Sequence, residues 1–180
     1  MIEIRIKKIR GISAEEQENI IKTLSTEARE RLSKKREPHL YLSSISAYSL
    51  LTENERADLD FTEGGTPFFK TLDASVSISH SQNYACTAIS ESKNARVGID
   101  IEEKTATPRT STRFLTPDEQ KMLERGTPYL EIWTKKESLF KFLKNDSPLP
   151  AIDSATPEKY GATLETRETD EYYLTVCTEK

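Results

Sequence analysis

Two helix-length segments, one in each half of the chain, constrain the fold most strongly. Residues 38–51 begin with a proline and carry apolar side chains on nearly every side of a helix, so we expect this helix to be deeply buried. Residues 129–144 form the second segment, which has Leu130, Trp133 and Phe140 among its apolar positions. Short stretches in which apolar and polar residues alternate predict strands at residues 2–8, 76–79, 84–89 and 97–101. The pattern therefore predicts an α+β fold of short antiparallel strands with a long helix in each half.

Helix caps and a closing hairpin complete this outline. Ser13 precedes an acidic first turn and predicts the start of a helix that extends, with a break near Ser25, to Arg36. The run 116–119 (Thr-Pro-Asp-Glu) combines a cap, a proline at the first helical position and a glutamate three residues after the cap, which predicts another helix. Residues 162–166 and 172–178 predict a hairpin, and no sequence repeat of fixed period occurs.

The composition indicates a globular protein of modest size. A chain of 180 residues forms one ordinary domain or two small halves that share a core. Although 31% of the residues are charged and the mean hydropathy is −0.65, the chain keeps enough aromatic residues to build a core. It has no signal peptide and no run of about 18 apolar residues, so we expect a cytoplasmic protein without membrane association. Cys86 and Cys177 lie in alternating segments and are interpreted as buried thiols.

The charge is unevenly distributed along the chain. The net charge is −4, yet residues 1–39 hold ten Lys and Arg against seven Asp and Glu. This excess is concentrated in Arg29, Arg31, Lys34, Lys35 and Arg36. Such a cluster can bind phosphate groups, but by itself it is more typical of a solvated helix face. The negative net charge and the lack of a basic stripe with interleaved aromatic residues argue against a nucleic-acid partner.

A pair of carboxylates follows Gly98 on the strand predicted at 97–101. Residues two apart share a strand face, so Asp100 and Glu102 point the same way while Ile99 and Ile101 point to the core. Two adjacent carboxylates suit Mg²⁺, which takes its other ligands from water and substrate phosphates. Gly98 would let another backbone or a ligand approach closely. A solvated strand end with two exposed acids explains the pair equally well.

A second set of polar residues lies on the helix predicted at 129–144. Trp133, Glu137 and Lys141 are four residues apart and share one helical face. Glu137 and Lys141 could form an ordinary helix ion pair, worth only about 0.3–0.5 kcal/mol. However, the single tryptophan of the chain is expected to be buried, which would partly desolvate both charged neighbours.

A third set ends the strand predicted at 76–79, where His80 lies between Ser79 and Ser81. These three side chains could donate several hydrogen bonds to a phosphate. Zinc is not indicated, because no Cys or second His lies at ligand spacing. Acyl transfer is not indicated either, since the Gly-x-Ser-x-Gly motif of a nucleophilic serine is absent.

Taken in order, these three motifs resemble the signature of the 4'-phosphopantetheinyl transferases. The motifs are Ser79-His80-Ser81, Gly98-Ile99-Asp100-Ile101-Glu102 and Trp133-x-x-Lys136-Glu137-Ser138-x-x-Lys141. The resemblance covers about residues 25–150 and is closest to the larger class, in which one chain forms a pseudo-dimer. It implies two similar halves, here residues 1–94 and 95–180, with coenzyme A bound in the cleft between them. Because one chain supplies both halves, we expect a monomer.

The resemblance also implies a reaction and a role for each matched residue. A serine of an acyl or peptidyl carrier protein attacks the β-phosphorus of coenzyme A, and adenosine 3',5'-bisphosphate leaves. Asp100, Glu102 and Glu137 match ligands of Mg²⁺, and Glu137 also matches the residue that activates the serine. Lys141 matches a lysine that contacts the diphosphate and could protonate the departing group. The remaining matches concern coenzyme A: His80 and Ser79 at its phosphates, and more loosely Lys34, Lys35 and Arg36 at its nucleotide.

Two departures from the family pattern weaken the expected hold on the nucleotide. The family commonly has a lysine before the loop proline, where this chain has Gly65-Thr66-Pro67. An arginine often follows the histidine at the start of the helix predicted here at residues 38–51, where this chain has His39-Leu40. Lys70 or Arg36 could compensate. The departures also favour an alternative, a non-catalytic family member that binds coenzyme A or a carrier protein. A phosphohydrolase that uses the same carboxylates is a third possibility.

Overall fold

The computed structural model describes residues 1–105, 112–144 and 147–180 and has the α+β class that the sequence predicts. The helices are α1 (Ala14–Thr23), α2 (Thr26–Ser33), α3 (Pro38–Tyr48), α4 (Glu53–Asp58), α5 (Pro117–Glu124) and α6 (Tyr129–Phe142). The strands are β1 (Ile2–Lys8), β2 (Leu59–Phe61), β3 (Pro67–Phe69), β4 (Ser75–His80), β5 (Tyr84–Ser90), β6 (Val97–Glu103), β7 (Ala162–Glu168) and β8 (Tyr172–Glu179). Short 3₁₀ helices occupy Thr112–Phe114, Leu149–Ala151 and Pro157–Tyr160.

The strands form two three-stranded antiparallel sheets and a small hairpin. The first sheet has the order β1-β5-β4, the second has the order β6-β8-β7, and β2 pairs with β3. In both three-stranded sheets the strand that comes last in the chain lies in the middle, and the first strand lies at an edge. The two sheets therefore share one topology although their sequences show no repeat.

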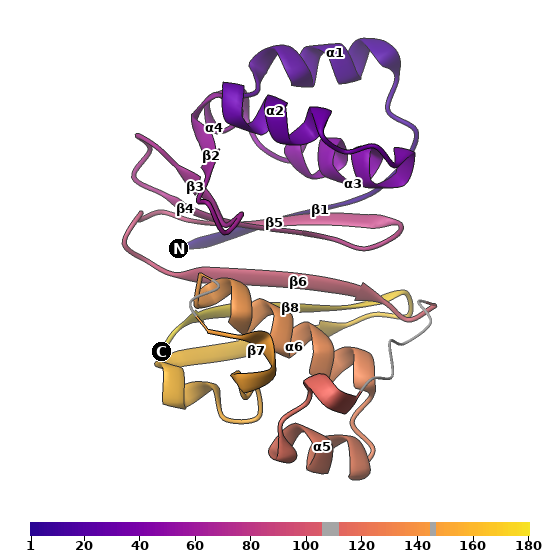
Figure 1. Ribbon diagram of the computed structural model, residues 1–180, viewed down its shortest axis with the longest axis vertical. Helices are drawn as coiled ribbons and strands as arrows, with labels where there is room; N and C mark the ends of the chain where they lie inside the picture. The colour runs from indigo at the N-terminus through magenta and orange to yellow at the C-terminus, as the bar shows by residue number, and fades with distance from the viewer. Residues whose placement is uncertain (106–111, 145–146) are drawn as a thin grey trace.

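The two sheets lie one above the other, with helices on the outer side of each (Figure 1). A core between them is built by side chains of β5, β6 and β8, with three isoleucines of β1 at its edge. A second core joins α1, α2 and α3 to the outer side of the first sheet, and a third joins α6 to the second sheet. Cys86 and Cys177 are buried free thiols, as predicted, and burial raises the pKa of Cys177 to about 12.

The helix ends differ from their predicted positions by a few residues. The break near Ser25 is confirmed, because Ser25 is extended and its hydroxyl accepts a hydrogen bond from the N–H of Ala28 at the start of α2. The prediction that this helix reaches Arg36 is wrong, since α2 ends at Ser33. Helix α3 ends at Tyr48, and its last six residues, 43–48, are buried. Helix α6 was predicted to extend to residue 144 and ends at Phe142.

The small elements between α3 and β4 were not predicted. Helix α4 has six residues and begins with a capping box between Thr52 and Glu55. Strands β2 and β3 have three residues each and are joined by the loop that contains Gly65 and Thr66. Among the described residues, no helix is both long enough and apolar enough to cross a membrane.

Candidate active site

A cleft of about 560 Å³ brings the three sequence motifs together. It lies where the end of β4, the middle of β6 and one face of α6 meet. The lining residues are Ile78, Ser79 and His80 from β4, Asp100 and Glu102 from β6, and Tyr129, Leu130, Trp133, Glu137 and Lys141 from α6. The predicted placement of Trp133, Glu137 and Lys141 on one helical face is therefore confirmed.

Gly98 allows α6 to lie directly against β6. A Cβ atom at this position would be 1.9 Å from the carbonyl oxygen of Ser138 and 2.7 Å from the backbone nitrogen of Phe142. The predicted alternation of β6 is also present, because Ile99 and Ile101 are buried while Asp100 and Glu102 line the cleft. The close approach at Gly98 thus brings the helix that carries Glu137 and Lys141 beside Asp100.

Lys141, Asp100 and Ser79 form a hydrogen-bond network at the base of the cleft. The ammonium Nζ of Lys141 is 2.7 Å from Oδ1 of Asp100, 2.8 Å from Oγ of Ser79 and 3.1 Å from the carbonyl oxygen of Ile99. The Ser79 hydroxyl also donates to Oδ1 of Asp100, at 2.7 Å. Lys141 is therefore paired with Asp100 of β6 rather than with Glu137 of its own helix.

Three alternate serines, Ser77 and Ser79 of β4 and Ser81 directly after it, join the two sheets. The Ser77 hydroxyl accepts a hydrogen bond from the N–H of Ile99 at 3.0 Å, and the Ser81 hydroxyl donates to Oε1 of Glu103 at 2.7 Å. Together with Ser79, these two serines contact β6 at Ile99, Asp100 and Glu103. The hydroxyls of Ser79 and Ser81, which we expected to face a phosphate, therefore donate to carboxylates. Contact of Ser79 with coenzyme A stays a prediction.

The carboxylates of the cleft suit a cation that is only partly enclosed by protein. Oδ2 of Asp100 is buried and has no hydrogen-bond partner among the described residues. Burial raises the pKa of the Glu137 carboxyl, and the negative charge of Asp100 raises it further. Within the described residues, no three His, Cys, Asp or Glu side chains come close enough to hold a metal ion by themselves. The donor set thus fits Mg²⁺ bound by one or two carboxylates, with water and substrate phosphates as its other ligands.

The charge of Lys141 is stabilised by its neighbours. Burial alone would lower the pKa of its ammonium group, but the charges of Asp100 and Glu137 outweigh burial and raise the pKa. The pKa of His80 is shifted in the opposite direction. Burial lowers the pKa of its imidazole, and the positive charges of Lys141 and Lys35 lower it further. The cleft therefore contains a charged lysine and a histidine that is neutral at neutral pH.

His80 also faces a smaller basic pocket of about 160 Å³ between α2, α3 and the β2–β3 loop. Its charged lining residues are Arg31 and Lys35, and the Arg31 guanidinium lies 4.4 Å from the centre of the Phe61 ring. Gly65 also lines the pocket, and a Cβ there would be 3.0 Å from the Arg31 guanidinium. Arg31 belongs to the basic cluster within residues 29–36 but was not among the residues expected at the nucleotide. Its membership of that cluster was the available signal, because Lys35 lies beyond the end of α2 and does not share a helix face with Arg31.

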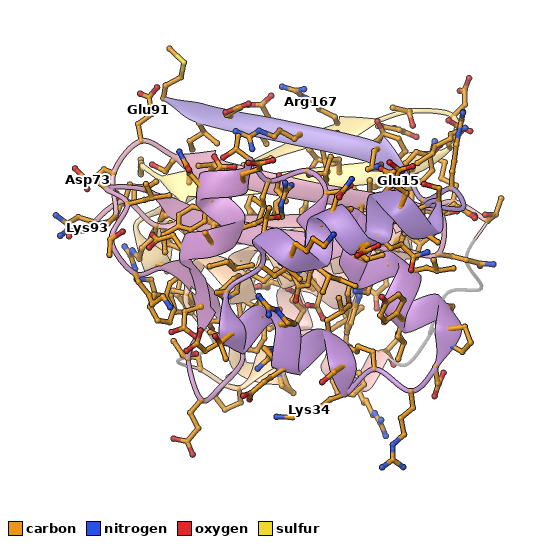
Figure 2. The ribbon with its side chains drawn as sticks, turned by 90° about the horizontal axis from the view of Figure 1, so that it is seen from above. Glu15, Lys34, Asp73, Glu91, Lys93 and Arg167 are labelled. Atoms are coloured by element: carbon orange, nitrogen blue, oxygen red, sulfur yellow. The ribbon has the colours of Figure 1, made fainter. Side chains whose placement is uncertain are left out.

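The other residues expected at the nucleotide lie outside both cavities. Lys34 and Arg36 are exposed and do not line the cleft or the basic pocket, and Lys34 projects from the edge of the molecule (Figure 2). Lys70, a possible substitute for the missing lysine, is also absent from both linings and pairs with Glu27 at 3.4 Å. Thr66, which replaces that lysine, donates to the carbonyl oxygen of Lys144.

Two aspects of the α6 motif differ from expectation. Trp133 is only partly buried, because it lines the cleft and stacks on Tyr129 with ring centres 6.1 Å apart. Lys136 is directed away from the cleft and is fully buried against Glu119 of α5, with Nζ 2.8 Å from Oε2. The motif therefore combines cleft residues with one residue that anchors the opposite side of the helix.

Comparison with known proteins gives one finding that bears on this site. A search of curated proteins found no match. A family model does match, and the matched stretch runs from the residue before β6 to Cys177 in β8. It includes Asp100, Glu102, Glu137 and Lys141, which line the cleft. Residues 96–177 thus match the 4'-phosphopantetheinyl transferase superfamily, which indicates a transferase of the phosphopantetheine group.

Proposed function

We propose that this protein transfers the 4'-phosphopantetheine arm of coenzyme A to a serine of an acyl or peptidyl carrier protein. One observation carries the proposal, namely that all three motifs line a single cleft. The residues from these motifs in the cleft are Ser79, His80, Asp100, Glu102, Trp133, Glu137 and Lys141. Five of them also lie in the stretch that matches the superfamily.

The arrangement of the sheets supports a pseudo-dimer as the larger framework. We propose that residues 1–94 and 95–180 are its two halves. Both contain an antiparallel sheet of the same topology with helices on its outer side. The cleft takes lining residues from both of these ranges. Because one chain supplies the whole cleft, we propose that the protein acts as a monomer.

Asp100 is the first candidate to hold Mg²⁺, through Oδ2, which has no hydrogen-bond partner among the described residues. Glu137 and Glu102 line the same cleft and are the candidates for a second carboxylate ligand. When bound, Mg²⁺ would polarise the diphosphate and neutralise the negative charge that develops on it. The protein contributes to the reaction mainly by orienting the serine hydroxyl and the diphosphate, and it need not form a covalent bond to either substrate.

Glu137 is placed to accept the proton of the carrier serine. Its raised pKa makes it a stronger base than an ordinary carboxylate, and general bases act best with a pKa near the working pH. As the serine oxygen bonds to the β-phosphorus, the bond from that phosphorus to the bridging oxygen breaks. The electron pair leaves with adenosine 3',5'-bisphosphate, and the serine proton passes to Glu137.

Binding of coenzyme A would use the cleft and the adjoining basic pocket. His80 lines both cavities, so it can contact phosphate groups in either one. Ser79 and Lys141 lie beside it in the cleft. Arg31 and Lys35 supply positive charge in the basic pocket. We propose that the exposed Lys34 and Arg36 contribute by longer-range attraction, which salt would screen.

Mass spectrometry of a carrier protein tests the proposed function. Several purified apo-carrier proteins are incubated with coenzyme A, Mg²⁺ and this protein, and a known transferase serves as the positive control for each. The expected result is that at least one carrier gains the mass of the phosphopantetheine arm. If no carrier gains mass although the control modifies all of them, the proposal is wrong.

Thr66 favours the alternative of a non-catalytic binding protein, since it removes a positive charge that the family commonly has. Calorimetry of coenzyme A and of each apo-carrier separates the two functions. Binding without any mass gain would identify a binding protein. Release of phosphate from nucleotides in the absence of a carrier would identify a phosphohydrolase instead.

A further inference from the structure

We infer that a second cavity, next to the cleft, binds the acyl end of an acyl-coenzyme A whose acyl group ends in a carboxylate. The inference rests on the proposed function, because it takes coenzyme A as the donor of the reaction. It adds a substrate class, the dicarboxylic acyl-coenzyme A thioesters, of which succinyl-coenzyme A is a simple example. It also assigns two lysines that would select this class.

Two further cavities adjoin the cleft on the side of the β2–β3 loop. A groove of about 170 Å³ lies between this loop and α6, and it shares Ile78, Glu137 and Lys141 with the cleft. The second cavity, of about 370 Å³, shares Thr66, Pro67 and Lys141 with the groove. The three spaces therefore follow one another in the order cleft, groove, second cavity.

The proposed position of coenzyme A leaves these two cavities to the far end of the molecule. Its nucleotide is assigned to the basic pocket and its diphosphate to the cleft. The pantetheine arm, with any acyl group on its sulfur, extends from the β-phosphorus on the side of the diphosphate that is remote from the nucleotide. The groove begins at Glu137 and Lys141, so an arm that enters it is led into the second cavity.

The second cavity combines an apolar floor with a positively charged rim. Its lining residues Phe69, Val76 and Val97 are buried and form the floor, and the exposed Lys93 and Lys144 lie at the rim. Among the described residues that line it there is no Asp or Glu. Its volume lies within the usual range of small-molecule pockets, about 300–1,000 Å³. The cavity thus suits a short apolar chain that ends in a negative charge.

The two lysines at the rim are anchored through their backbone. The N–H of Lys93 donates to Oδ1 of Asp73 at 3.0 Å, and Figure 2 shows Lys93 at the edge of the molecule. The carbonyl oxygen of Lys144 accepts from the Thr66 hydroxyl at 3.4 Å. A third basic residue of the lining, Arg96, has its Nε 3.3 Å from a carboxylate oxygen of Glu179. We therefore assign recognition of the carboxylate to Lys93 and Lys144.

The acyl group takes no part in the bonds that change during transfer. The serine oxygen bonds to the β-phosphorus, the bond from that phosphorus to the bridging oxygen breaks, and the serine proton goes to Glu137. The thioester stays intact, so the carrier protein receives the arm with its acyl group still attached. The second cavity therefore affects which arms are delivered and leaves the phosphoryl chemistry unchanged.

Calorimetry with two matched coenzymes tests the carboxylate site without turnover. Succinyl-coenzyme A and butyryl-coenzyme A have acyl chains of the same carbon number, and these chains end in a carboxylate and a methyl group, respectively. Both are titrated into the wild-type protein with Mg²⁺ and without a carrier protein. We expect succinyl-coenzyme A to bind about two- to tenfold more tightly, as two solvent-exposed ion pairs would give. Equal or weaker binding of succinyl-coenzyme A would overturn the inference.

The double variant Lys93→Gln, Lys144→Gln should lose this preference. Removing two positive charges weakens the binding of both coenzymes through the phosphates that they share, so the ratio of the two dissociation constants is the readout. The matched control is Lys22→Gln, Lys180→Gln, which removes two exposed lysines that line neither the groove nor the second cavity. The control should keep the wild-type ratio. A rim variant that keeps this ratio, or a control that loses it, would contradict the assignment.

Transfer assays separate this inference from the proposed function. If the wild type transfers the arm of coenzyme A but does not prefer the succinyl thioester, the inference is wrong and the proposed function stands. If it transfers nothing yet shows a preference that depends on the two lysines, the proposed function fails and the carboxylate site stands. If the rim variant raises the KM for the carrier protein and leaves the coenzyme ratio unchanged, the lysines bind the carrier protein and the inference is wrong.

Discussion

At the scale of single residues, the cleft depends on what lies at alternate positions of β6. Gly98, Asp100 and Glu102 share the strand face that is directed to α6, and Ile99 and Ile101 occupy the opposite face. The glycine allows the helix to approach, and the next residue on that face receives Lys141. The carboxylate and the lysine can therefore meet because a side chain is missing two residues earlier.

Replacing Gly98 by alanine should separate α6 from β6. The added Cβ would lie 1.9 Å from the Ser138 carbonyl oxygen, and a backbone atom cannot move aside as a flexible side chain can. Overpacking of this kind costs about 1–3 kcal/mol or more, which corresponds to a fall in melting temperature of roughly 2–12 °C. Transfer activity should be lost even at temperatures where the variant remains folded, because the contact between Lys141 and Asp100 depends on this close approach.

Gly11→Ala is the matched control, because a Cβ at Gly11 meets no atom within 4 Å. Differential scanning calorimetry and transfer assays of both variants provide the comparison. We expect Gly11→Ala to melt within about 2 °C of the wild type, as surface substitutions generally do. Equal melting temperatures and equal activities for the two variants would show that the site tolerates a wider spacing between α6 and β6.

At the scale of elements, α6 is held from its opposite side by a buried ion pair. Lys136 and Glu119 have side chains that are 0% exposed, and Nζ of Lys136 also donates to the carbonyl oxygen of Ile152. Oε1 of Glu119 accepts hydrogen bonds from the backbone N–H and the hydroxyl of Ser154, at 2.8 and 2.7 Å. One pair thus joins α5, α6 and the segment around residues 152–154, while Glu119 also caps α5.

Removing one partner of this ion pair should lower the free energy of unfolding far more than removing both partners does. Lys136→Met leaves the buried Glu119 without its counter-ion and should lower the free energy of unfolding by about 3–5 kcal/mol. The double variant Lys136→Met, Glu119→Leu removes both charges and should recover at least half of that loss. Urea denaturation measures both values. If the double variant is less stable than Lys136→Met alone, the pair does not act as a charge-compensated unit.

The long elements could be predicted from sequence because their signals are local. Alternation gave β1, β4, β5 and β6, and caps gave the starts of α1 and α5. The hairpin of β2 and β3 was missed because three residues are too few to show a period of two. Lys136 was recognised only as part of a motif. Its partner Glu119 is 17 residues away, and a pairing of this range is created by tertiary packing.

At the scale of the whole molecule, the cleft exists because two sheets of equal topology are joined through β4 and β6. The sequence predicted which residues of each motif share a face of their strand or helix. It did not predict that Lys141 pairs with Asp100, 41 residues away, or that the serines in and directly after β4 bind β6. These contacts depend on how the sheets pack against each other. The periodicity of the sequence carries no information about that packing.

The location of a bound cation and of coenzyme A tests the central claim most directly. Crystals are grown with coenzyme A and Mn²⁺, whose anomalous scattering identifies the metal. The account predicts a peak in the cleft within about 2.5 Å of Oδ2 of Asp100 and of a Glu137 carboxylate oxygen, with the diphosphate bound to the same ion. A metal bound away from both carboxylates, or a coenzyme whose diphosphate lies outside the cleft, would contradict it.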